Sequence, residues 1–156
     1  MTDFAKARLL ALVVPSALML GALGSQYIGG LHPCEMCYWQ RWPHDAAIVL
    51  ALFAFGTRVN KASHVLVALA ALAIMVSGGI GVFHAGVENG WWEGITTCST
   101  TAAGVSLEDI MRAPVVRCDV PQWTLLGISL AGFNAIISLG AGAAILALLR
   151  RPGRTA

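Results

Sequence analysis

Long runs of apolar residues dominate the chain. Three of them cover residues 9–30, 64–82 and 123–149, and Asn134 is the most polar member of the last run. Each meets the requirement of roughly 20 residues for a helix that crosses a hydrocarbon core of about 30 Å. The pattern therefore predicts three transmembrane helices.

A fourth apolar run, residues 46–55, is too short to cross a membrane by itself. Its ten residues cover roughly half of the hydrocarbon core at about 1.5 Å per residue. To span, a helix must begin near Tyr38 and carry Arg41 and Asp45 into or near one membrane face. If this segment does not span, the chain crosses three times.

Lysine and arginine decide between these topologies. With four crossings, one side of the membrane holds seven basic residues and one acid, and the other holds three basic residues and seven acids. The basic residues of the first side are Lys6, Arg8, Arg58, Lys61, Arg150, Arg151 and Arg154. This is the bias of the positive-inside rule, whereas three crossings would place the last three arginines outside.

We therefore predict an all-α integral membrane protein, a bundle of four transmembrane helices with both termini in the cytoplasm. The expected helices are approximately residues 9–30, 38–56, 64–84 and 123–149, and the two extracytoplasmic loops are residues 31–37 and 85–122. A cleaved signal peptide ending near Ala22-Leu23-Gly24 is the alternative for the N-terminus. The apolar run continues to Gly30, which is longer than an ordinary signal segment and favours a retained helix.

Composition agrees with this class. The 156 residues are 57% hydrophobic and 12% charged, with a mean hydropathy of +0.72, whereas soluble domains usually carry about 25% charged residues. Repeats, low-complexity tracts and linkers are absent, so residues 1–156 are expected to form one membrane domain. Neither a P-loop nor a dinucleotide-binding glycine motif occurs, so the sequence predicts no nucleotide-binding site. We also expect no nucleic-acid partner.

All four cysteines fall on the predicted outer side: Cys34 and Cys37 in the first loop, Cys98 and Cys118 in the second. The outer side of a bacterial inner membrane faces an oxidising compartment, in which disulfides persist. A zinc site of four cysteines normally has two closely spaced pairs, whereas 19 residues separate Cys98 from Cys118, so no metal is predicted. The sequence leaves three possible disulfide pairings open.

The Cys34–Cys37 pair is better suited to redox chemistry than to structural support. A disulfide that closes so small a loop stabilises a fold least, and thiols in a Cys-x-x-Cys motif can have a lowered pKa. The alternative is a non-catalytic four-helix membrane scaffold with two structural disulfides.

Arg41 strengthens the redox interpretation. An arginine at membrane depth costs about 2.5–3.5 kcal/mol on insertion scales, and less near the interface. On one helix, Cys37, Arg41 and Asp45 share a face at i, i+4 and i+8, unless Pro43 breaks or kinks the helix. Arg41 could then lower the pKa of Cys37 and donate to a carbonyl ligand, or it could snorkel and pair with Asp45. A lipid-soluble quinone, ubiquinone or menaquinone, suits both the thiols and the arginine.

Three separated motifs resemble the bacterial disulfide bond formation protein B family (DsbB). They are PCEMCYWQR at residues 33–41, FHAGVENGWWEGITTC at residues 83–98 and CDVPQWTLLGISLAGFN at residues 118–134. The resemblance implies a bacterial inner-membrane thiol:quinone oxidoreductase with its redox cysteines on the periplasmic side. Its partner would be a soluble periplasmic oxidase of thioredoxin fold, similar to DsbA.

The resemblance also implies a role for each site residue. The partner's dithiol attacks a Cys98–Cys118 disulfide, and Cys98 takes the mixed disulfide. Cys118 then attacks Cys34, and Cys37 faces the quinone, which Arg41 holds and polarises. His84 corresponds to a histidine near the quinone, although an interfacial histidine without a ligand is an equally simple interpretation.

One further alternative is an enzyme of the vitamin K epoxide reductase type, which also has four helices and two cysteine pairs. There, the Cys-x-x-Cys motif follows the loop pair. Here it comes first in the chain, which argues against that family.

Overall fold

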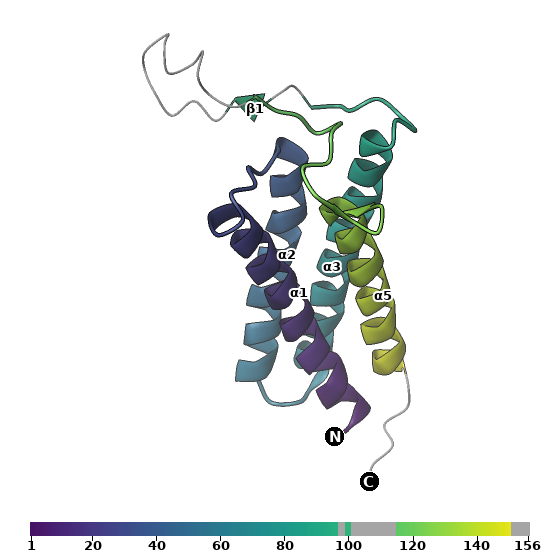
Figure 1. The fold of residues 1–156 in the computed structure, drawn as a ribbon. Coiled ribbons are helices and arrows are strands. Elements are labelled where there is room, and N and C mark those ends of the chain that lie inside the picture. Colours follow the sequence, from purple (N-terminus) through teal and green to yellow (C-terminus); the bar gives the residue numbers. More distant parts are fainter. Residues whose placement is uncertain (97–98, 101–114, 151–156) are drawn as a thin grey trace.

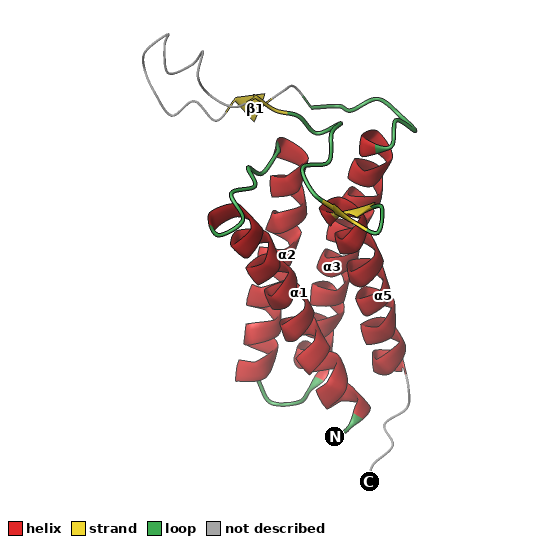
Figure 2. Ribbon diagram, viewed as in Figure 1, coloured by secondary structure: helices red, strands yellow, loops and turns green. Residues whose placement is uncertain are grey.

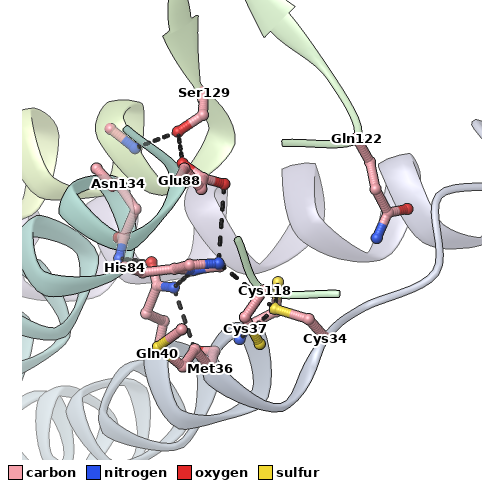
Figure 3. A network of polar contacts seen from close by, with 12 residues as sticks. Cys34, Met36, Cys37, Gln40, His84, Glu88, Cys118, Gln122, Ser129 and Asn134 are labelled. Carbon is pink, nitrogen blue, oxygen red and sulfur yellow. Dashed lines mark hydrogen bonds and ion pairs between the residues drawn. The ribbon is translucent and has the colours of Figure 1, made fainter. Parts of the chain in front are cut away.

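The computed structural model describes residues 1–96, 99–100 and 115–150, and its helices form an elongated bundle (Figures 1 and 2). The helices are α1 (Asp3–Tyr27), α2 (Glu35–Gly56), α3 (Lys61–Glu88) and α5 (Leu130–Arg150). The start of α1, the α2–α3 turn and the end of α5 lie at one end of the bundle (Figure 1). The α1–α2 connection lies at the other, which we call the cysteine end because Cys34 and Cys118 are there (Figures 1 and 3).

The start of α2 is set by Cys34, which is its N-cap residue. Cys34 Sγ accepts a hydrogen bond from the Cys37 backbone N–H at 3.2 Å, in the manner of a capping side chain. The helix thus begins three residues before the predicted Tyr38, and it runs through Pro43 to Gly56 without interruption. Cys37 and Arg41 therefore do lie on one continuous helix.

The start of α5 differs from the sequence-based prediction. Strands β3 (Thr124–Leu125) and β4 (Ile128–Ser129) form an antiparallel hairpin, so the helix begins at Leu130 rather than at residue 123. The two turn residues, Leu126 and Gly127, have φ of 52° and 78°, which suits a two-residue hairpin turn and is incompatible with a right-handed helix. Apolar composition alone does not reveal this turn.

A second short ladder lies at the cysteine end. Strand β1 (Ser99–Thr100) pairs antiparallel with β2 (Val115–Val116). This pairing holds the chain just before Cys118 in register with the chain just after the predicted loop cysteine, Cys98. Cys98 itself lies outside the described residues.

Small side chains fill the centre of the bundle, and large apolar ones face outward. The fully buried core consists mainly of alanines, namely Ala7, Ala11, Ala47, Ala51, Ala54, Ala70 and Ala71, joined by Val67, Ile74 and Ile145. Leu20, Phe53 and Ile136 are each more than 60% exposed. This arrangement suits a helix bundle in lipid, where small residues allow close approach and apolar side chains need no burial.

Three described helices, α1, α3 and α5, are long and apolar enough to cross a membrane. The first part of α2 is polar, with Glu35, Arg41 and Asp45 within its first eleven residues. Its second half nevertheless packs into the same core through Ala47, Ala51 and Ala54.

The contact between α3 and α5 yields a first prediction. A Cβ added to Gly81 would lie 2.9 Å from the Ala131 carbonyl oxygen, whereas one added to Gly79 would have nothing within 4 Å. Gly81→Ala should therefore destabilise the bundle by about 1–3 kcal/mol, as overpacking does. Gly79→Ala on the same helix is the matched control and should not destabilise it. Unfolding in mixed micelles, followed by circular dichroism, measures both; equal losses would contradict the assigned contact.

Candidate active site

The first cysteine pair lies at the N-terminus of α2, with the two Sγ atoms 2.7 Å apart and both thiols free. Cys34 is 2% exposed, and Cys37 is partly buried. The pKa of Cys34 is raised because its thiol hydrogen-bonds to Cys37 and because it is buried. Cys34 thus keeps its proton and donates to Cys37 Sγ, close to the positive end of the helix dipole. The geometry suits reversible disulfide chemistry between these residues.

The loop brings Cys118 onto this pair. Cys34 Sγ, Cys118 Sγ and a ring nitrogen of His84 all lie within 4.8 Å of one another, and all three residues are buried. Cys118 is only 8% exposed and accepts a hydrogen bond from Thr96 Oγ1 at 3.2 Å. Figure 3 shows the three sulfur atoms gathered beside His84.

A small apolar cluster holds the loop in this position. Val116 and Cys118 pack against Met36 and Val87 at the ends of α2 and α3. The Arg117 guanidinium forms an ion pair with Asp119, which lowers the pKa of that carboxyl. Val116 and Cys118 thus point into the cluster, whereas Arg117 and Asp119 are exposed.

His84 occupies the centre of the cysteine end. Its Nε2 lies 3.6 Å from Cys34 Sγ and 3.7 Å from Glu88 Oε1. Its Nδ1 lies 2.8 Å from Gln40 Nε2, which can only donate, so we assign the ring proton to Nε2. Ser129 Oγ donates to the second oxygen of Glu88. The ring thus presents an N–H to the Cys34 sulfur and to Glu88 (Figure 3).

Arg41 lies one helical turn beyond Cys37 and reaches toward α1. Its Nη1 donates to Gln26 Oε1 at 2.6 Å, and its Nη2 donates to the Ala22 carbonyl at 3.3 Å. The guanidinium also lies over the Tyr38 ring, 5.3 Å from the centroid. These contacts on α1 take the place of the Asp45 pairing considered from the sequence.

A cavity of about 250 Å³ opens beside these residues. Its wall is largely apolar and comes from α1, α2, α5 and the segment before β3, including Ala17, Leu18, Ala22, Val120, Trp123 and Phe133. Cys34, Cys37, Arg41 and His84 also line it. The cavity therefore combines the apolar lining and the few polar groups typical of small-molecule sites.

A buried polar network beside His84 was not predicted from the sequence. Asn134 Nδ2 donates to Gln40 Oε1 at 2.8 Å, and Asn134 Oδ1 lies 2.9 Å from His44 Nε2. Ser77 and Ser138 complete the network. Asn134 stood out as the polar residue of its apolar run, and polar residues inside membrane helices generally pair. That signal could have suggested a partner, but not which one.

Comparison with known proteins places the chain in a family. The family model described as "Disulfide bond formation protein DsbB" matches residues 5–148. The chain belongs to the DsbB family. This match covers α2, α3 and nearly all of α1 and α5, and the family indicates an oxidoreductase role in disulfide bond formation.

Individual relatives agree with the DsbB assignment. Disulfide bond formation protein B of Acidovorax sp. (strain JS42) is 32% identical over 99% of this chain and 93% of its own length. The protein of that name from Polaromonas sp. (strain JS666) is 30% identical over 94% of this chain and 92% of its own. An uncharacterized protein of Rickettsia prowazekii is 27% identical over 83% and 79%. No solved structure matched at a comparable level of significance.

Proposed function

We propose that the protein is a thiol:quinone oxidoreductase that reoxidises a periplasmic DsbA-like partner. The observation that carries the proposal is the position of Cys118 against Cys34, with Cys37 and Arg41 opening onto an apolar cavity. A loop cysteine that lies against the Cys34–Cys37 pair can exchange a disulfide with it, and this pair adjoins a space for a lipid-soluble acceptor.

The order of exchange follows from access. Cys34 and Cys118 are both buried, so the cysteine of a folded partner cannot reach either sulfur. We therefore assign the attack by the partner to Cys98 of a Cys98–Cys118 disulfide, which frees the Cys118 thiolate. That thiolate attacks Cys34 of a Cys34–Cys37 disulfide, forms the Cys34–Cys118 bond and releases Cys37. His84 can stabilise a Cys34 thiolate through its Nε2–H.

The residues around the cavity fit a quinone. Quinone carbonyls are hydrogen-bond acceptors, and the Arg41 guanidinium is a donor already anchored at the cavity wall by Gln26 and Ala22. A bound quinone would supply the two-electron acceptor that the dithiol needs. Cys37 supplies the thiolate nearest to Arg41, and the apolar wall excludes water.

We also propose that α2 is a fourth membrane span, with both termini in the cytoplasm and the cysteine end in the periplasm. The start of α1, the α2–α3 turn and the end of α5 share one end of the bundle (Figure 1). The basic residues Lys6, Arg58 and Lys61 belong to that end, as the positive-inside rule requires of a cytoplasmic face.

The direct test is quinone reduction in membranes that contain the protein. Addition of a reduced DsbA-like partner should reduce ubiquinone and oxidise the partner in equal amounts. Absorbance of the quinone and thiol alkylation of the partner measure the two sides. Membranes without the protein are the control. A scaffold with structural disulfides would give no quinone reduction, and that result would overturn the proposed function.

A further inference from the structure

We propose that His44 is a second quinone-binding residue, and that its Nδ1 binds the reduced form, the hydroquinone, in preference to the quinone. The proposal rests on the proposed function and adds a ligand contact deeper in the same cavity. It begins from a buried atom that has no hydrogen-bond partner among the residues that the structure describes.

His44 is 3% exposed and lines the cavity. Its Nδ1 is buried and has no hydrogen-bond partner in the described part of the chain. A buried polar atom without a partner costs about 1–3 kcal/mol, so such atoms require an explanation. A ligand in the cavity that supplies the missing hydrogen bond is the explanation we adopt.

The surrounding network fixes which ring nitrogen carries the proton. Ser77 Oγ donates its hydrogen to the Gln40 carbonyl at 2.7 Å, and Ser138 Oγ donates to Asn134 Oδ1 at 2.8 Å. Both hydroxyls can therefore only accept from the histidine. His44 Nε2 lies 2.9 Å from Ser77 Oγ and 2.9 Å from Asn134 Oδ1, and at these contacts both oxygens can only accept. We assign the ring proton to Nε2, which leaves Nδ1 as a bare acceptor.

His84 differs in this respect. Its Nδ1 already accepts from Gln40, and its Nε2 faces Cys34 and Glu88. Of these two cavity histidines, His44 is thus the one with an unused ring nitrogen. The sequence pointed to His84 as a site residue, but no motif indicated a site role for His44.

The position of His44 suits contact with a bound quinone at the edge of its ring farthest from Cys37. Cys37, Arg41 and His44 follow at i, i+4 and i+7, so they share a helix face, and all three line the cavity. His44 lies about 10 Å farther along the helix axis than Cys37, at about 1.5 Å per residue. Arg41 can therefore donate near the thiols while His44 accepts deeper in the bundle.

A hydrogen-bond acceptor at the position of His44 Nδ1 discriminates between the quinone and the hydroquinone. A quinone carbonyl has only lone pairs to offer, whereas a hydroquinone hydroxyl can donate to Nδ1. When the Cys34 and Cys37 thiols become a disulfide, they release two electrons and two protons, and the quinone takes up both to become the hydroquinone. His44 therefore favours the product side of this transfer.

The test compares the binding of a short-chain ubiquinone and of its hydroquinone to purified protein under anaerobic conditions. In His44→Leu, hydroquinone affinity should fall by about 3- to 10-fold, the value of one hydrogen bond, while quinone affinity stays unchanged. His44→Asn, whose side-chain oxygen can occupy the position of Nδ1, should retain most of the preference. Ser138→Ala, which contacts only the Nε2 side, is the matched control and should resemble wild type.

The outcomes separate this proposal from the proposed function. Equal losses for both ligands, or no loss for either, would show a purely structural histidine and overturn the proposal, even if the wild type reduces quinone. Wild-type protein that binds neither ligand would overturn the proposed function as well. If His44→Leu does not fold, His44→Phe, which refills the volume of the ring, takes its place.

Discussion

A Cys118→Ala variant should accumulate a covalent complex with its thiol partner and lose turnover. The disulfide of the oxidised partner exchanges with the Cys98 thiol, which forms the mixed disulfide and frees the partner's second thiol. Cys118 is no longer present to displace the partner, and alkylation with N-ethylmaleimide blocks the freed partner thiol from reversing the exchange. Cys34 is 2% exposed, so it is out of reach of a folded partner. Non-reducing electrophoresis should show the complex, and peptide mapping should place the bond at Cys98.

The control is a double variant, Cys98→Ala with Cys118→Ala, which should form no complex. Loss of the complex in this variant shows that Cys34 and Cys37 do not react with the partner directly. A bond mapped to Cys34 in the single variant would reverse the proposed order of exchange. It would also mean that the cysteine end opens further than its buried sulfurs indicate.

Replacement of Arg41 by methionine should raise the KM for quinone by about 10- to 100-fold. A hydrogen bond from a charged donor is worth about 1.5–3 kcal/mol, and about 1.4 kcal/mol corresponds to a factor of ten. Arg41→Lys keeps the charge but loses the planar pair of donors, so it should recover only part of the affinity. Quinone reduction at saturating partner concentration, with quinone varied, measures the effect.

Arg8→Met is the matched control for Arg41. Arg8 also donates to a backbone carbonyl of a neighbouring helix, that of Ala54, and also lies over an aromatic ring, that of Phe55. It is located near the start of α1 and is not among the residues that line the cavity. Its replacement should leave the KM unchanged. A similar rise in both variants would assign the effect to general loosening of the bundle.

Local features of the site could be predicted because they depend on a single element. Cys34, Cys37 and Arg41 lie within eight residues, so a continuous helix brings them to one place once its start is known. The Cys34 cap supplies that start. Charge distribution likewise predicted a fourth membrane crossing from an apolar run of only half the required length. The structure has a helix, α2, at this position, and that it crosses the membrane is our proposal.

Two other features could not be predicted from apolar periodicity. The β3–β4 turn, with Leu126 and Gly127 at positive φ, interrupts an apolar run that resembles a continuous helix. One partner of Asn134, Gln40, lies 94 residues earlier in the chain. Apolar periodicity carries no information on either feature. The turn depends on the backbone conformation of two residues, and the contacts of Asn134 depend on which surfaces meet after the helices pack.

The sequence by itself determined the helical membrane class and, through three motifs, the family. Its charge distribution predicts the orientation in the membrane, and the Cys-x-x-Cys spacing predicts redox chemistry for the cysteine pair. Only the tertiary structure decided that Cys118 lies against Cys34, that Arg41 turns to α1 and that Nδ1 of His44 has no partner among the described residues. The physical reason is that such contacts are fixed by the packing of helices in three dimensions, which local sequence patterns do not specify.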